Sequence, residues 1–79
     1  MDNEKILCLL SNVTGREYIE LAQLSNETPL INIGFKSIQF IRFIISVEEE
    51  FNIEILDSDL LLSNFDTLEK IYITLTKYL

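Results

Sequence analysis

The chain has 79 residues, of which 48% are hydrophobic, and a formal net charge of −7 that comes from 6 basic and 13 acidic side chains. This length and apolar content predict a single domain, residues 1–79, with a compact core, and exclude wholesale disorder. The acidity argues against binding to nucleic acid or to an anionic membrane and favours partners with basic patches. No stretch is apolar for long enough to span a bilayer, the N-terminus has no basic signal region, and the single Cys8 excludes an internal disulfide, so we expect a cytoplasmic protein.

The predicted elements begin with a helix over residues 3–13. Asp2 or Asn3 can cap its start, and Gly15 can take the left-handed position after its end. Its apolar side chains recur at helical spacing, at Ile6, Leu7, Leu10 and Val13.

A long loop is predicted from Arg16 to Gly34, because this stretch holds the only proline and a cluster of polar residues. Its length exceeds that of the usual connection, which indicates either a function or an anchored course over the core. We expect a short helical turn near residues 18–24, and Leu30 and Ile33 as the anchors.

The next helix is predicted over Ser37–Phe51. Gly34 supplies a flexible turn ahead of it, and Ser37 suits the N-cap position or the first turn. Asn52 can adopt the left-handed conformation that ends a helix.

A short third helix is predicted over residues 57–62, with Asp57 as its cap. Asp66 or Thr67 then opens a last helix, and Lys77 near its end suits the negative end of the helix dipole. The apolar side chains of this helix lie near one face, at Leu68, Ile71, Tyr72, Leu75 and Leu79. Together the elements predict an all-α fold: a small four-helix bundle with three main helices, one short helix and a long first loop.

The helix over residues 37–51 carries more apolar surface than a helix of a small bundle usually buries. At about 100° per residue, its apolar side chains form two adjacent sectors. The first sector contains Phe40, Phe43, Ile44, Val47 and Phe51. The second contains Ile38, Ile41 and Ile45. This second sector forms either an exposed docking face beside Ser37 or a surface packed under the loop of residues 16–34. The six acids between Glu48 and Asp59, with no base among them, form either a solvated face or a docking surface.

The absence of histidine removes Ser-His and Cys-His catalysis and the commonest metal ligand. No glycine-rich phosphate loop is present, and so short a chain hardly shields a carboxylate pair from water. We therefore expect no catalytic residue and no metal site. Ser37 is either a helix cap or an attachment point, since a helix N-terminus also accommodates a phosphate.

Several segments together resemble the acyl and peptidyl carrier proteins. Residues 34–38 (GFKSI), then Ile41, then residues 47–55 (VEEEFNIEI) are similar to the family's modified-serine motif and to the acidic end of the helix that follows it. Further similarities lie at residues 28–30, 57–62 and 65–68. The resemblance covers essentially the whole chain.

The resemblance implies a carrier that is not an enzyme. A phosphopantetheinyl transferase would join 4′-phosphopantetheine covalently to Ser37, and the arm would hold acyl, aminoacyl or aryl groups as thioesters. An adenylating or acyl-loading enzyme would charge the arm, and condensing or transferring enzymes would receive the cargo. The positions that would contact these partners are Ile38, Ile41, Arg42, Ile45, Glu48 and Glu49. We expect the carrier to be a monomer.

Two residues depart from the family pattern. Lys36 stands where aspartate or histidine is frequent, and Arg42 stands where fatty-acid carriers often have glutamate. Both place positive charge near Ser37, which weakens binding to a partner that reads acidic charge. We therefore favour a free-standing carrier of nonribosomal peptide or polyketide-type biosynthesis. The alternatives are a carrier of fatty-acid synthesis and an unmodified carrier-like interaction module in which Ser37 is only a cap.

Overall fold

The computed structural model describes residues 2–79, and the regular elements in this range are all helical. The α-helices are α1 (Asn3–Thr14), α2 (Tyr18–Ala22), α3 (Ser37–Phe51) and α4 (Leu68–Thr76). Short 3₁₀ turns lie at Leu30–Ile33, Asp57–Asp59 and Leu62–Asn64. The predicted small all-α bundle is confirmed. None of the helices in residues 2–79 combines the length and the apolar character needed to cross a membrane.

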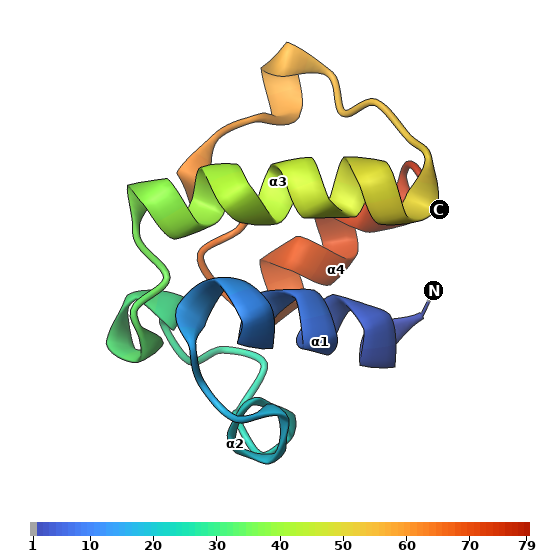
Figure 1. The fold of residues 1–79 in the computed structure, drawn as a ribbon. Coiled ribbons are helices and arrows are strands. Elements are labelled where there is room, and N and C mark those ends of the chain that lie inside the picture. Colours follow the sequence, from blue (N-terminus) through green and yellow to red (C-terminus); the bar gives the residue numbers. More distant parts are fainter. Residues whose placement is uncertain (1) are drawn as a thin grey trace.

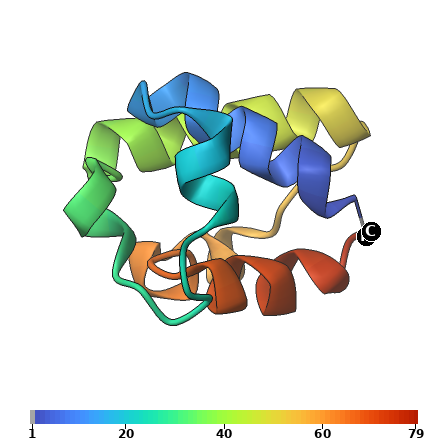
Figure 2. The ribbon, with the colours of Figure 1, turned by 90° about the horizontal axis from the view of Figure 1, so that it is seen from below.

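α1 and α3 lie side by side and run in opposite directions, and α4 packs on their far side (Figure 1). Seen from below, α2 runs crosswise to α1, and α4 lies opposite the α1–α3 pair (Figure 2). The segment between α3 and α4 lies above α3 in Figure 1 and is set back toward α4 in Figure 2, and the start of α1 lies close to the C-terminal end of the chain in both views. The start of α3 is therefore at the end of the molecule opposite to the termini.

An aromatic cluster at the centre of the core fixes the start of α3. The ring of Phe35, just ahead of the helix, packs edge-on against Phe43 with centroids 5.7 Å apart. The ring centroid of Phe40 lies 5.3 Å from that of Phe65, which precedes α4. Phe35, Phe43 and Phe65 are buried, so the segment that leads into α3 is held by its own side chain.

The starts of α1 and α4 and the end of α3 follow predicted capping signals. Oδ1 of Asp2 accepts the N–H of Lys5 at 3.1 Å at the start of α1, and Oγ1 of Thr67 accepts the N–H of Lys70 at 3.2 Å at the start of α4. Asn52 ends α3 in the left-handed conformation, with φ 53°. The side chains of Asp2 and Thr67 thus satisfy backbone N–H groups that α1 and α4 leave free at their starts.

The first loop also follows the prediction. The helical turn expected near residues 18–24 is present as α2. Leu30 and Ile33, the expected anchors, are both buried.

The prediction of one continuous helix over residues 57–62 is wrong. The segment instead makes two 3₁₀ turns, because Leu61 between them is extended, with φ −117° and ψ 133°. Asp57 is the first residue of a turn and provides no side-chain cap. A second correction concerns Leu79, which was placed on the apolar face of the last helix. α4 ends at Thr76, and Leu79 is exposed beyond it.

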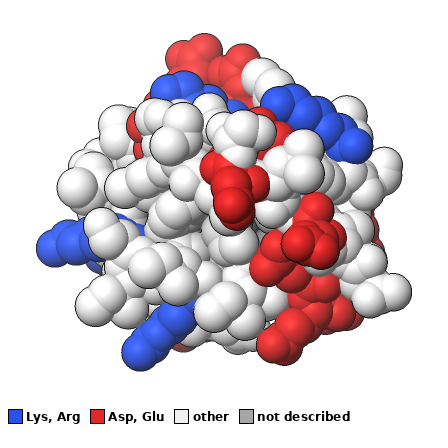
Figure 3. All heavy atoms as spheres, turned by 90° about the horizontal axis from the view of Figure 1, so that it is seen from above, with Lys and Arg blue, Asp and Glu red and all other residues white. Residues whose placement is uncertain are grey.

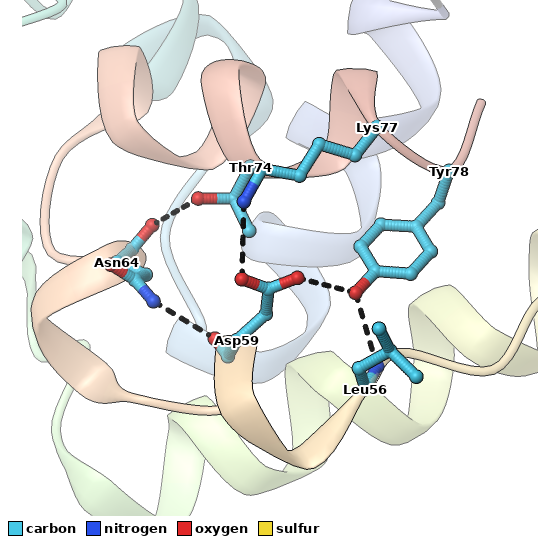
Figure 4. A network of polar contacts seen from close by, with 6 residues as sticks. All are labelled: Leu56, Asp59, Asn64, Thr74, Lys77 and Tyr78. Atoms are coloured by element: carbon cyan, nitrogen blue, oxygen red, sulfur yellow. Dashed lines mark hydrogen bonds and ion pairs between the residues drawn. The ribbon is translucent and has the colours of Figure 1, made fainter.

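A polar network ties the segment after α3 to the C-terminal end of the chain (Figure 4). Oδ2 of Asp59 accepts the phenol hydroxyl of Tyr78 at 2.5 Å, and its Oδ1 accepts the ammonium of Lys77 at 3.1 Å. The phenol oxygen of Tyr78 in turn accepts the N–H of Leu56 at 3.1 Å. The other contacts are Asn64 Nδ2 to the Asp59 carbonyl and Thr74 Oγ1 to the Asn64 carbonyl. Partners distant in sequence therefore hold this segment, in addition to the backbone hydrogen bonds of its two 3₁₀ turns.

Candidate functional site

Ser37 is the first residue of α3, and its side chain is exposed. Gly34 turns the chain at φ 86°, a conformation that favours glycine, and buried Phe35 then directs it into the helix. Lys36 occupies the N-cap position, and its N–H donates to Oε1 of Gln39 at 3.2 Å. Of the two positions predicted for Ser37, the first turn is confirmed and the N-cap is wrong. Among the described residues no side chain or backbone group hydrogen-bonds the Ser37 hydroxyl, so this oxygen is free.

A groove of about 550 Å³ opens beside Ser37. Its apolar lining comes from Pro29, Ile31, Phe35 and Leu62. Its polar lining, besides Ser37, comes from Lys36, Ser63 and Asp66. Such a lining combines apolar surface with a few hydrogen-bonding groups, as small-molecule sites in proteins do.

The second apolar sector of α3 is exposed. Ile38, Ile41 and Ile45 are 62%, 57% and 50% exposed, so they do not pack under the loop of residues 16–34. Their exposure agrees with the alternative hypothesis, in which the three isoleucines form an accessible face beside Ser37. A shallow hollow of about 240 Å³ lies next to this face, lined by Phe40, Ile41, Ile44, Ile45 and Leu60. Exposed apolar surface of this kind is typical of a protein–protein contact.

Glu48 differs from the other predicted contact positions because it already has an internal partner. Its side chain is half-buried, and Oε2 accepts the N–H of Ile55 at 2.9 Å. The carbonyl of Glu48 also accepts the N–H groups of Asn52 and Ile53. Glu48 therefore holds the chain that leaves α3.

Charge is separated along α3. Lys36 and Arg42 are exposed toward the Ser37 end, and Glu49 and Glu50 are exposed toward the other end. Figure 3 shows basic side chains over the N-terminal end of α3, at the left, and a group of acidic side chains over its C-terminal end, at the right. The face beside Ser37 thus differs in sign from the net charge of the chain.

Asp59, which contacts Tyr78, lies on the same segment as Leu62 and Ser63, which form one wall of the groove. The hydrogen bond from Tyr78, then the one from Lys77, lowers the pKa of Asp59 below its usual value. The hydrogen bond to Asp59, with partial burial, raises the pKa of Tyr78. Asp59 is therefore charged and Tyr78 protonated at neutral pH, which is the state that holds the segment leading to Leu62 and Ser63.

Sequence reasoning brought together Ser37, the isoleucines and Arg42, and the structure places them on one helix. It missed the groove lining at Ile31, Leu62 and Ser63. Ile31 could have been noticed as an apolar residue between two predicted anchors. No sequence signal links Asp59 to Tyr78, because the contact joins two loop ends across the fold.

The family model described as phosphopantetheine attachment site matches residues 4–75. The matched range runs from the first turn of α1 into α4 and includes Ser37 and the whole groove lining. No curated protein and no solved structure matches the chain.

Proposed function

Because the chain belongs to the phosphopantetheine attachment family, that of the acyl and peptidyl carrier proteins, we propose that Ser37 bears the 4′-phosphopantetheine that this family carries covalently. The observation that supports this assignment is the Ser37 hydroxyl itself. It is exposed, has no hydrogen-bond partner among residues 2–79, and lies at the start of a long helix at the edge of a groove.

The surroundings of Ser37 fit a phosphodiester and the arm attached to it. The first N–H groups of α3 and the positive end of its dipole favour an anion at this position. Lys36 adds a positive charge next to it. The apolar lining at Ile31 and Leu62 suits the aliphatic part of the arm, and Ser63 and Asp66 suit its amides.

Other serines are less suited to this role. The hydroxyl groups of Ser11 and Ser46 donate to backbone carbonyls of their own neighbourhood, and Oγ of Ser25 accepts the N–H of Glu27. Ser63 is the strongest competitor because it lines the same groove. It lies in a short 3₁₀ turn, however, and lacks the long helix that stabilises an anion at Ser37.

In the proposed modification, Oγ of Ser37 attacks the phosphorus of coenzyme A that bears the pantetheine. A new O–P bond forms, the bond to adenosine 3′,5′-bisphosphate breaks, and the hydroxyl proton passes to a base of the transferase. The attached group ends in a thiol, which supplies the thioester linkage for an acyl, aminoacyl or aryl cargo. The chain contributes position rather than catalysis, because a tethered cargo meets each partner at a high effective concentration.

We assign this carrier to nonribosomal peptide or polyketide-type biosynthesis rather than to fatty-acid synthesis. The exposed Lys36 and Arg42 beside Ser37 support this choice, since they oppose a partner surface built to read acidic charge there. Loading by an adenylating enzyme with an amino or aryl acid would agree with the assignment. Efficient and exclusive turnover by fatty-acid synthesis enzymes would contradict it.

Intact mass measurement tests the attachment. The folded protein is incubated with coenzyme A, Mg²⁺ and a broad-specificity phosphopantetheinyl transferase, beside a known carrier as a positive control. We expect one phosphopantetheine addition to the wild type and to Ser63→Ala, and none to Ser37→Ala. An addition to Ser37→Ala refutes the assignment. No addition to any folded form leaves an unmodified interaction module.

A further inference from the structure

Among residues 2–79, the basic side chains without a nearby carboxylate lie together at one end of α3. The chain has six basic side chains, and four of them pair with a carboxylate. These pairs are Lys5 with Glu50, Arg16 with Glu20, Lys70 with Asp66 and Lys77 with Asp59, at 3.1–3.5 Å. Within residues 2–79, Lys36 and Arg42 have no carboxylate oxygen within 4.0 Å. In a chain with 13 acidic side chains, both cations that lack a partner lie at the Ser37 end of α3.

Both cations lie where an enzyme must sit in order to reach Ser37. Lys36 is adjacent to Ser37 in the chain, and both side chains are exposed. Arg42 lies about 40° around the helix from Ile38, at the border of the exposed isoleucines. An active site that closes over Oγ of Ser37 and covers this apolar face therefore also covers Lys36 and Arg42.

Covering an exposed cation removes part of its hydration, and this cost is recovered only if the partner supplies an opposite charge. We propose that the phosphopantetheinyl transferase that modifies Ser37 presents carboxylates to Lys36 and Arg42, beside an apolar surface that receives the isoleucines. This inference rests on the proposed function of Ser37. It specifies a negatively charged partner surface at this end of α3, whereas the net charge of −7 would select a positively charged partner.

The test is the steady-state rate of phosphopantetheine transfer by the transferase of the same organism, with coenzyme A as donor. The variants are Lys36→Glu and Arg42→Glu, together with the neutral forms Lys36→Gln and Arg42→Gln. Lys5→Glu is the matched control. It makes the same change in net charge, but Lys5 pairs with Glu50, about 20 Å along α3 from Ser37. Circular dichroism establishes that each variant is folded.

We expect each reversal to lower kcat/KM about tenfold at low ionic strength, mainly through KM, with the neutral forms between the reversal and the wild type. The differences should shrink at high ionic strength, because salt screens exposed charges. Lys5→Glu should stay near the wild type. Reversals that are modified as fast as the wild type or faster overturn the inference, as does an equal loss in Lys5→Glu. A wild type that takes up no group instead refutes the proposed function, and this inference falls with it.

Discussion

The phenol oxygen of Tyr78 lies 2.5 Å from Oδ2 of Asp59, although 19 residues separate the two in the chain. Through this contact the C-terminal end of the molecule holds the segment that leads from α3 to Leu62 and Ser63 in the groove wall (Figure 4).

Tyr78→Phe should lower the urea midpoint of unfolding, because it leaves the N–H of Leu56 without its phenol acceptor and Asp59 without its phenol donor. Amide exchange should become faster in residues 56–64 in particular. The matched control is Tyr72→Phe, since the Tyr72 hydroxyl makes no hydrogen bond among the described residues. Equal losses in the two variants would show that the Tyr78 contact does not hold the segment.

The contribution of Asp59 to stability should depend on pH. Its folded-state pKa is lowered below 3.8 by the Tyr78 and Lys77 hydrogen bonds, so the unfolded chain binds the proton more readily. The stabilisation is therefore present above the unfolded-state pKa and is lost as the pH falls through the folded-state pKa. The Tm difference between wild type and Asp59→Asn should persist at neutral pH and shrink in acid.

The contribution of Tyr78 to stability depends on pH in the opposite direction, because it is lost at alkaline pH rather than in acid. Its folded-state pKa is raised above 10.0, so its contribution is complete below that value and is lost as the pH rises through the folded-state pKa. A Tm difference between wild type and Tyr78→Phe that grows with rising pH would contradict this account.

Ile41→Asp and Ile44→Asp form a matched pair on one helix. Ile41 is exposed, and its replacement should change the unfolding free energy by no more than about 0.5 kcal/mol while it impairs turnover by partner enzymes. Ile44 is buried, and its replacement should cost about 3 kcal/mol or more, because it places a charge in the core. Urea unfolding measures both costs. A similar loss in the two variants would show that Ile41 belongs to the core.

Ser37→Ala should leave the stability within about 0.5 kcal/mol of wild type, because the Ser37 side chain caps no backbone group. Thr67→Ala should cost about 1 kcal/mol, because Oγ1 of Thr67 accepts the N–H of Lys70 at the start of α4. Chemical unfolding of the two variants distinguishes a helix cap from a free hydroxyl. A Ser37→Ala cost equal to that of Thr67→Ala would restore the cap interpretation.

The bounds of α3 could be read from the sequence because several local signals agree. Gly34 and Asn52 have the left-handed conformations that their residue types favour, and the apolar spacing between them is helical. The exposed isoleucines were also predictable in part, since a small bundle cannot bury so wide an apolar arc.

The segment after α3 could not be read in this way. Its turns depend on Tyr78, which binds Asp59 from beyond the end of α4, and on Asn64, which binds the Asp59 carbonyl from the second turn. Such contacts leave no periodic pattern in the sequence. The position of Ser37 shows a similar limit. Serine is favoured as an N-cap, but the burial of Phe35 sets the start of α3 so that Lys36 takes that position.

The attachment of phosphopantetheine to Ser37 is tested most directly by locating the group in the wild-type protein. Trypsin cuts after Lys36 and Arg42, so Ser37 is the sole serine on the peptide Ser37–Arg42, whereas Ser46, Ser58 and Ser63 fall together on Phe43–Lys70. After treatment with coenzyme A, Mg²⁺ and the transferase, fragment-ion mass spectrometry should find phosphopantetheine on Ser37–Arg42. The group on Phe43–Lys70, or a modified protein with an unmodified Ser37–Arg42 peptide, would contradict the assignment.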